Sequence, residues 1–330
     1  MRIPSSASSN PISRRIQPIP NLSSINQSHN MSSTIPKPVT SPPTTTHVLL
    51  TYPSPYVLLV TINRPRQMNS IPFAGHTEMG QVFDWFDAEP NLRVAIVTGA
   101  GDRAFCAGQD LIELGKIGQG IVEKDVAKQR HPLSGFGGLS RRSGKKPVIA
   151  AVNGLALGGG FETVLGWWVP TSSLCRKLFG FPARICLCAA PSAIFGLPEA
   201  LRGIYAAAGG PARLVRNVGI PIATEMALTG KPITAQRAKE LNLVNRIAPS
   251  QSTVVDEAVK LAGEIAAISP DAAIVTRAAL REAWETGSVE RATQITIDRY
   301  TAALNAGENA AEGLRAFAEK RKPDWKPSKL

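Results

Sequence analysis

The stretch that decides the fold runs from residue 146 to residue 162 and reads Lys146-Pro-Val-Ile-Ala-Ala-Val-Asn-Gly-Leu-Ala-Leu-Gly-Gly-Gly-Phe-Glu162. Residues 147–152 are apolar and partly β-branched, and Asn153-Gly154 ends the run, so this part predicts a buried strand followed by a turn. The glycines after it allow a ligand to approach the backbone closely. The turn could therefore present a free backbone N–H, with the carboxylate of Glu162 at its end.

A second strand and a second glycine-containing turn precede this stretch. Residues 92–98 predict another buried strand, and the later turn reads Ala104-Phe-Cys-Ala-Gly-Gln-Asp110. Two backbone N–H groups that converge on one oxygen would form an oxyanion hole. Glu199 follows a Pro-restricted turn, and two carboxylates that face one polarised carbonyl suit proton transfer at the carbons beside it. The structural alternative is that these glycines only pack elements together and that each Glu lies on a solvated face.

The remaining pattern predicts an α/β protein with a helical C-terminal part. Residues 57–62 predict a strand, with residues 48–52 as its hairpin partner, and residues 73–88 carry apolar side chains at helical spacing. Strands that alternate with helices indicate a layered α/β body. From about residue 222 onward we expect only helices, within residues 235–241, 254–268, 271–285, 289–306 and 310–320.

The composition favours neither a nucleic-acid partner nor a membrane. The chain has 330 residues and a net charge of +12. Residues 1–46 hold four basic residues and no acidic one, which leaves 33 basic against 25 acidic residues, spread along the rest. In that first segment Ser, Thr and Pro supply 24 of 46 residues, so we expect a disordered arm, or a leader that precedes initiation at Met31. No long apolar run predicts a spanning helix, and the four Cys suit a reducing compartment.

Several common functional motifs are absent from the sequence. Gly99-Ala-Gly101 nearly fits the dinucleotide fingerprint, but residues 105–108 predict a second turn rather than a helix. Neither a phosphate-binding loop ending in Gly-Lys-Ser/Thr nor a Gly-x-Ser-x-Gly elbow occurs. The four His have no metal-ligand spacing, and Cys186-x-Cys188 has no second pair. We therefore expect no metal and no redox cofactor.

Taken together, the motifs resemble the enoyl-CoA hydratase/isomerase, or crotonase, superfamily. The resemblance runs in order from about residue 47 to residue 325 and rests on residues 62–65, 68–69, 94–99, 104–111, 146–162, 193–199, 208–214, 228–231, 238–245 and 319–323. It implies a spiral of ββα units with a helical C-terminal region that forms a homotrimer or a dimer of trimers. The expected parts are a disordered arm (1–46), the spiral core (47–245), the helical region (246–322) and an exposed tail (323–330).

The same resemblance implies where the active site lies. The backbone N–H groups of Gln109 and Gly159 would hold the thioester oxygen, so their amides matter more than their side chains. Glu162 and Glu199 would be the acid/base pair, which favours a hydratase over an isomerase. Coenzyme A, as part of an acyl-CoA or enoyl-CoA substrate, would contact Gln109, Asp110, Leu111, Arg64, Arg66 and Lys320.

One segment departs from the family pattern. Glu162 and Glu199 lie 37 positions apart, farther than in family hydratases, because of an atypical insertion at about residues 166–188. The insertion is rich in Cys and Trp and contains no acidic residue. It is either a retained intron or a surface loop. Because it falls between both carboxylates, an inactive protein that binds CoA is the alternative function.

The end of the sequence indicates a location. Ser328-Lys329-Leu330 is the tripeptide that the peroxisomal import receptor reads at a carboxyl terminus. With the acid-free arm, it resembles fungal peroxisomal enzymes of secondary metabolism, which dehydrate mevalonyl-CoA for siderophores or serve the acyl chains of toxins. The alternatives are a β-oxidation enoyl-CoA hydratase and a Δ3,Δ2-enoyl-CoA isomerase.

Overall fold

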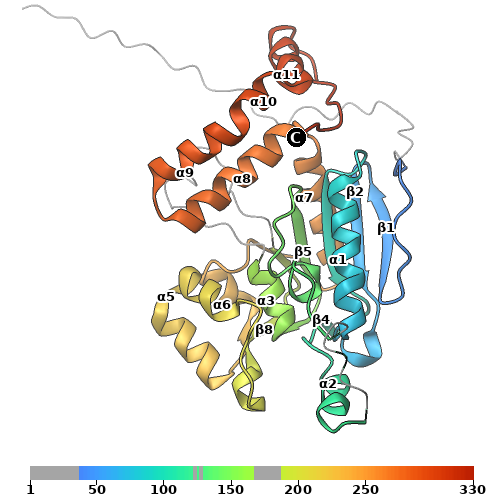
Figure 1. Cartoon of the computed structure of the whole chain (residues 1–330), viewed down its shortest axis with the longest axis vertical. Coiled ribbons are helices and arrows are strands. Elements are labelled where there is room, and N and C mark those ends of the chain that lie inside the picture. The colour runs from blue at the N-terminus through green and yellow to red at the C-terminus, as the bar shows by residue number, and fades with distance from the viewer. Residues whose placement is uncertain (1–36, 122–124, 126–128, 167–186) are drawn as a thin grey trace, which may run out of the picture. The chain divides into compact units, whose positions relative to one another are not determined.

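Two sheets form the body of the protein. The computed structural model describes residues 37–121, 125, 129–166 and 187–330. The larger sheet has the order β1-β2-β3-β5-β7-β10, and the smaller one the order β4-β6-β8-β9. Figure 1 shows β1, β2 and β5 of the larger sheet beside α1. The strands of the larger sheet are β1 (Val48–Ser54), β2 (Val57–Ile62), β3 (Val94–Gly99), β5 (Val148–Val152), β7 (Leu187–Ala189) and β10 (Arg246–Ile247). Those of the smaller sheet are β4 (Ala104–Cys106), β6 (Leu155–Leu157), β8 (Ile194–Gly196) and β9 (Ile233–Thr234).

The long apolar runs form the centre of the larger sheet. Every residue of β3 and β5 is buried, and β3 pairs in parallel with both β2 and β5. Strands buried on both faces read as continuous apolar runs, which is why the sequence revealed them. The predicted hairpin is confirmed, since β1 pairs antiparallel with β2. The predicted helix over residues 73–88 is α1 (Phe73–Ala88), which buries Met79, Val82, Phe83 and Phe86.

The two sheets are built from a repeated unit. Each of β3, β5 and β7 is followed by a short strand of the second sheet, namely β4, β6 and β8, and β4-β6-β8 pair in parallel. A helix comes next in each case: α2 (Leu111–Gly118), α3 (Gly159–Gly166) and the 3-10 helix η4 (Pro198–Arg202). This order confirms the predicted spiral of ββα units. It also brings the ends of β4, β6 and β8 to the same edge of the smaller sheet.

The C-terminal part adds helices to this body. After α5 (Gly210–Thr229) and α6 (Ala235–Glu240), α7 (Val254–Ala266) packs against β3, β5 and β7. Figure 1 shows the later helices as a neighbouring group (orange to red). They are α8 (Pro270–Thr286), α9 (Val289–Thr296), the π-helix η5 (Ile297–Thr301), α10 (Ala302–Asn305) and α11 (Glu308–Ala318). No helix in the described ranges combines the length and apolarity needed to cross a bilayer.

Three expectations about the elements were wrong. The turns expected over residues 104–110 and 154–162 begin with the strands β4 and β6. The part after residue 222 is not all helical, because β9 pairs with β8 and β10 pairs with β7. Strands of two or three residues are too short to show a period in the sequence. The helix expected over residues 289–306 is divided by a π-helical turn into α9, η5 and α10.

Ordered structure begins before residue 47, where the sequence placed the end of the arm. The backbone N–H groups of Val39 and Thr40 donate to the buried carboxylate of Glu89 at 2.9 and 2.8 Å. This contact depends on hydrogen bonds rather than on apolar burial, so composition does not reveal it. The arm over residues 1–36 and most of the insertion, residues 167–186, lie outside the described residues. The insertion joins the end of α3 to the start of β7.

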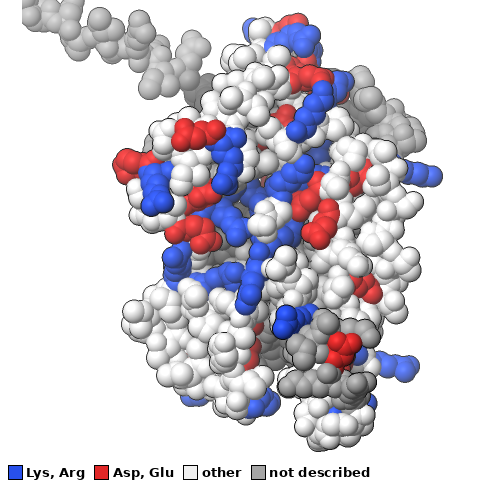
Figure 2. Space-filling model, viewed as in Figure 1, with Lys and Arg blue, Asp and Glu red and all other residues white. Residues whose placement is uncertain are grey.

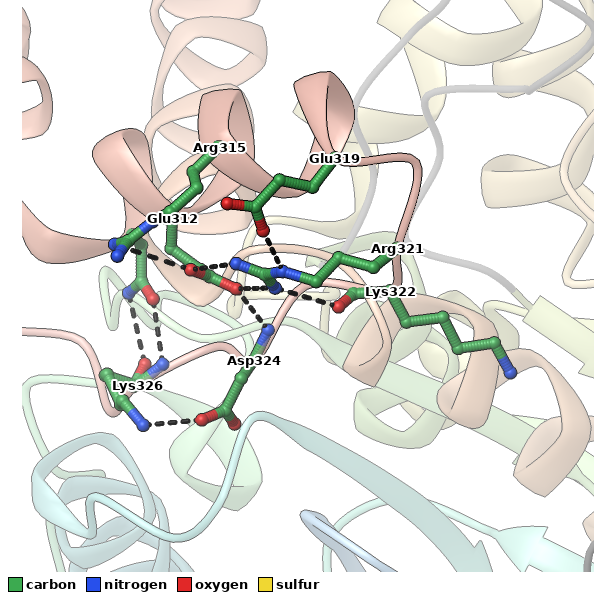
Figure 3. A network of polar contacts seen from close by, with 8 residues as sticks. Glu312, Arg315, Glu319, Arg321, Lys322, Asp324 and Lys326 are labelled. Atoms are coloured by element: carbon green, nitrogen blue, oxygen red, sulfur yellow. Dashed lines mark hydrogen bonds and ion pairs between the residues drawn. The ribbon is translucent and has the colours of Figure 1, made fainter.

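The tail, expected to be exposed, is held by polar contacts. Arg321 binds Glu312 by two hydrogen bonds of 2.5 and 3.0 Å, and the N–H of Asp324 at the start of the tail donates to Glu312 at 2.8 Å. Figure 3 shows these residues around Glu312. Trp325 donates its indole N–H to the carbonyl of Ala267 at 2.9 Å, and its own carbonyl accepts from Arg93 at 2.9 Å. Most side chains after residue 322 are nevertheless exposed.

Part of the positive charge of the body is structural. Figure 2 shows Lys and Arg side chains concentrated where α8 meets the core. Arg142 pairs with Asp87 at 2.5 Å and is itself buried, while Arg281 of α8 donates to the carbonyl of Arg142 at 2.8 Å. Burial and the charge of Arg142 lower the pKa of Arg277 to about 10. These cations hold α8 on the core. None of the three lines the cavity that contains the candidate site residues, which is described below.

Candidate active site

One cavity gathers most of the predicted site residues. It has a volume of about 380 Å³ and contains Gln109, Gly159, Glu162 and Glu199, together with Leu111. Gln109 lies in the loop before α2 and Leu111 begins α2, while the others lie in the first turn of α3 and in η4, so these residues follow the strands β4, β6 and β8. The other lining residues are Phe73, Ala107, Gly108, Leu114, His131, Phe136, Leu157, Gly158, Pro198, Arg202, Ile204, Tyr205, Ala207 and Ala208.

The two glycine-containing loops meet closely at the cavity. A Cβ built on Gly108 would lie 3.1 Å from the carbonyl oxygen of Leu157 and 3.3 Å from the nitrogen of Gly159. One built on Gly158 would lie 3.0 Å from Oε1 of Glu199. Both glycines also have positive φ angles, +101° and +54°, which L side chains rarely adopt. Gly108 therefore lets the first loop contact the second, and Gly158 brings the backbone of the second loop against Glu199.

Ile71 fixes the loop that carries Gln109. The N–H of Ile71 donates to the carbonyl of Gly108 at 2.9 Å, and the carbonyl of Ile71 accepts from the N–H of Asp110 at 3.0 Å. The side chain of Asn69 binds the carbonyls of Ala100 and Ala104 at 2.9 and 2.7 Å, just before this loop. Gly159 is the first residue of α3, where backbone N–H groups have no partner within the helix. The amides of Gln109 and Gly159 are thus held at one edge of the cavity.

The two carboxylates have different surroundings. Glu162 is 3% exposed and accepts the N–H of Gly210 at 2.8 Å. The pKa of Glu162 is raised to about 7, mainly by burial and also by the negative charge of Glu199. The N–H groups of Gly210 and Ala208 and the positive charge of Arg213 act in the opposite direction and lower it. Burial also raises the pKa of Glu199. Oε2 of Glu199 is buried and has no hydrogen-bond partner among the described residues, so this oxygen can take a proton from a ligand or a water.

The residues expected to bind coenzyme A are only partly at the cavity. Gln109 and Leu111 line it. Asp110 caps the start of α2 and pairs with Arg64 at 2.9 Å, while Arg64 also donates to the carbonyl of Ser70 at 2.6 Å. This pair therefore supports the loop that carries Gln109. Arg66 and Lys320 are exposed and do not line the cavity.

Sequence reasoning missed three cavity residues with polar side chains. Arg202 of η4 brings a cation to the cavity wall, and its position three residues after Glu199 could have suggested it. His131 also lines the cavity, and its ring lies 4.5 Å from that of His76 and 5.6 Å from that of Phe136. Tyr205 is the third. The two histidines are 55 positions apart, so no local pattern links them.

The sequence matches the family described as enoyl-CoA hydratase/isomerase over residues 54–166 and 183–328. It is 45% identical over 292 residues to the mevalonyl-coenzyme A hydratase of Beauveria bassiana, covering 88% of this chain and 98% of that protein. It is 43% identical to the Aspergillus fumigatus protein of the same name, over 87% and 98% of the two chains. It is also 38% identical to the carnitinyl-CoA dehydratase of Escherichia coli, over 82% and 95%.

The fold has solved counterparts. The crystal structure of an enoyl-CoA hydratase from Mycobacterium tuberculosis superposes with a TM-score of 0.71 at 33% identity, over 86% of this chain and 99% of that one. An enoyl-CoA hydratase from Bacillus anthracis gives a TM-score of 0.71 at 31% identity, over 86% and 100%. The predicted crotonase fold is confirmed.

The chain belongs to the enoyl-CoA hydratase/isomerase family. It is therefore an enzyme of the enoyl-CoA hydratase/isomerase type, and its similarity to proteins named as hydratases supports a hydro-lyase over an isomerase. Residues 167–182 fall between the two matched segments, inside the stretch that the sequence marks as an insertion. The retained intron and the surface loop remain the two hypotheses for it.

Replacing Glu199 by Gln should lower the pKa of Glu162 from about 7, because it removes one of the two effects that raise it. Burial of Glu162 remains in this variant, so the pKa should stay above its ordinary value of 4.5. Carboxyl carbon NMR titration of the purified protein measures the change. Glu225→Gln, at an exposed position of α5, is the matched control and should leave the titration of Glu162 in place. An unchanged titration in Glu199→Gln would show that the two carboxylates do not interact.

Proposed function

We propose that the enzyme dehydrates a branched 3-hydroxyacyl-CoA thioester of the mevalonyl-CoA kind, and hydrates the product in reverse. The observation that carries the proposal is that Glu162 and Glu199 share one cavity with the loops that hold Gln109 and Gly159. Similarity to two fungal mevalonyl-coenzyme A hydratases supports the acyl group. It also supports a role in fungal secondary metabolism, in which the enzyme would act on the acyl chain of a siderophore or a toxin. Fatty-acid β-oxidation is the alternative role.

In this proposal the backbone and the two carboxylates have separate tasks. The N–H groups of Gln109 and Gly159 donate to the thioester oxygen and stabilise the enolate that forms when C2 loses a proton. One carboxylate accepts that proton, and the other delivers a proton to the C3 hydroxyl, which leaves as water. Glu162 can exchange a proton near neutral pH because its pKa is about 7. Hydration runs through the same steps in reverse.

Two matched variants test the chemistry. Glu162→Gln and Glu199→Gln should each lower kcat/KM by about 10²–10⁴-fold, the range for loss of a general acid or base. The assay follows the ultraviolet absorbance of the conjugated enoyl thioester, which hydration removes. Glu225→Gln on the surface of α5 is the control and should retain wild-type rates. Absence of turnover in the wild-type chain across short, medium and branched enoyl-CoAs, with CoA binding retained, would instead identify a binding protein.

We also propose that the enzyme is peroxisomal and a partner of the import receptor. The support is Ser328-Lys329-Leu330. In the folded chain Lys145 donates to the carbonyl of Leu330 at 2.6 Å in a partly buried contact, and Lys329 pairs with Glu308 at the surface. An amino-terminal fluorescent fusion should co-localise with a peroxisomal marker, and removal of residues 328–330 should disperse it. The control Lys322→Ala should keep the fusion at the peroxisomal marker. A cytosolic signal from the intact chain would contradict the proposed location.

Finally, we propose a homotrimer or a dimer of trimers built on the C-terminal helices. Large apolar side chains are exposed there, since Val289 is 73%, Leu314 75% and Phe317 85% accessible in the single chain. Light scattering should give three or six times the chain mass. The double variant Leu314→Glu with Phe317→Glu should lower that mass. Leu49→Glu, on β1, is the control and should keep it. A monomeric wild-type chain would overturn the proposal.

A further inference from the structure

In the carboxamide of Gln109 the oxygen has a hydrogen-bond partner, whereas the nitrogen has none among the described residues. Its Oε1 lies 2.8 Å from Nε2 of His76. Its Nε2 is buried and has no hydrogen-bond partner among the described residues. A buried donor without a partner destabilises the protein, so such a group is expected to serve a ligand or to be removed.

The orientation of this carboxamide follows from the hydrogen bonds of His76. The backbone N–H of Gly137 donates to Nδ1 of His76 at 3.0 Å, so Nδ1 carries no proton. His76 is fully buried, which lowers its pKa to about 3 and keeps the ring neutral. The proton is therefore on Nε2, which donates to Gln109, and the atom that accepts must be the oxygen. The amino group of Gln109 consequently points away from His76.

Other contacts hold this arrangement in place. The ring of His76 packs on Phe136 at 4.4 Å and on His131 at 4.5 Å between centroids. Nε2 of His131 also lies 3.4 Å from Oε1 of Gln109. Because both histidines face the same oxygen, rotation of the carboxamide would place its amino group against the proton of His76. The amino group is thus pre-oriented.

No side chain among the described residues accepts a hydrogen bond from this amino group, although Glu162, Glu199 and Tyr205 also line the cavity. Phe73, Leu111, Leu114 and Phe136, which line the cavity with Gln109, are apolar. In the proposed mechanism the thioester oxygen is taken by backbone N–H groups, one of them from Gln109 itself. The side chain belongs to the same residue and lines the same cavity, so an acceptor on an acyl group bound there would give the amino group a partner.

We propose that the Gln109 carboxamide donates a hydrogen bond to an oxygen on the acyl chain and thereby selects oxygen-bearing acyl-CoA substrates over hydrocarbon ones. This inference rests on the proposed function, because it assumes that the acyl group occupies this cavity. The oxygen could belong to a hydroxyl or to a carboxylate, which share the acceptor chemistry. Gln109 is then a residue for substrate specificity in addition to its backbone role.

Three enoyl-CoAs that differ only at the far end of the acyl chain test the proposal. They are 3-methylpent-2-enoyl-CoA, its 5-hydroxy derivative, and 3-methylglutaconyl-CoA, which carries a carboxylate. The wild-type enzyme should prefer an oxygen-bearing thioester over the hydrocarbon one. In Gln109→Met, which keeps the length and removes the donor, that ratio of kcat/KM should fall by about 10- to 100-fold. Any change in the oxyanion hole affects all three substrates and cancels in the ratio.

A second variant distinguishes the two oxygens. Gln109→Glu keeps an acceptor for His76 and replaces the amino group by an oxygen, so a hydroxyl can still donate to it while a carboxylate is repelled. If Gln109→Glu still prefers the hydroxyl substrate, the oxygen that Gln109 binds belongs to a hydroxyl. If the wild-type enzyme prefers the carboxylate substrate and Gln109→Glu loses that preference, the oxygen belongs to a carboxylate. Gln119→Met, on the exposed residue after α2, is the matched control and should keep the wild-type ratio.

An unchanged ratio in Gln109→Met would overturn the inference. If that unchanged ratio came with an equal loss on all three substrates, Gln109 would belong to the common chemistry. Dissociation constants for the three thioesters, measured by calorimetry, make the test independent of turnover. If no thioester reacts, the proposed function is wrong. The ratio of the dissociation constants still decides whether Gln109 selects the oxygen.

Discussion

The site depends on the close contact of two backbone loops that have no side chains between them. Gly108, with a φ of +101°, lies against Leu157 and Gly159, and a Cβ on Gly160 would overlap the carbonyl oxygen of Cys106. This contact is possible because β4, β6 and β8 are parallel neighbours, which brings the loops after them to one edge of the sheet. The amides of Gln109 and Gly159 and the carboxylates of Glu162 and Glu199 all follow from that arrangement.

Burial then gives the two carboxylates their chemical character. In water both would be ionised at neutral pH, whereas here the cavity raises the pKa of Glu162 to about 7 and raises that of Glu199 as well. The N–H of Gly210 limits the shift at Glu162, while Oε2 of Glu199 is left without a partner among the described residues. Unequal environments of this kind let two identical side chains act as acid and base.

Much of this could be predicted from the sequence. The strands β2, β3 and β5 and the helix α1 appear as long apolar or periodic runs, and the four residues of the proposed catalytic centre lie in motifs of the family. The short strands β4, β6, β9 and β10 could not be predicted, because two or three residues carry no period and pair only once the sheets exist. The ion pair between Arg64 and Asp110 could not be predicted either, because the two residues lie 46 positions apart and meet only in the folded chain.

The sequence by itself determined the family, because the family motifs occur along the chain in a defined order. That resemblance in turn implied the ββα order and the two candidate carboxylates. Only the tertiary structure decided the state of Gln109. The sequence indicated that its backbone amide matters more than its side chain. Folding places His76, 33 positions earlier in the chain, against the oxygen of its carboxamide and leaves its amino group buried without a partner among the described residues. A hydrogen bond between residues so far apart is set by how α1 packs beside the loop, and no local pattern encodes it.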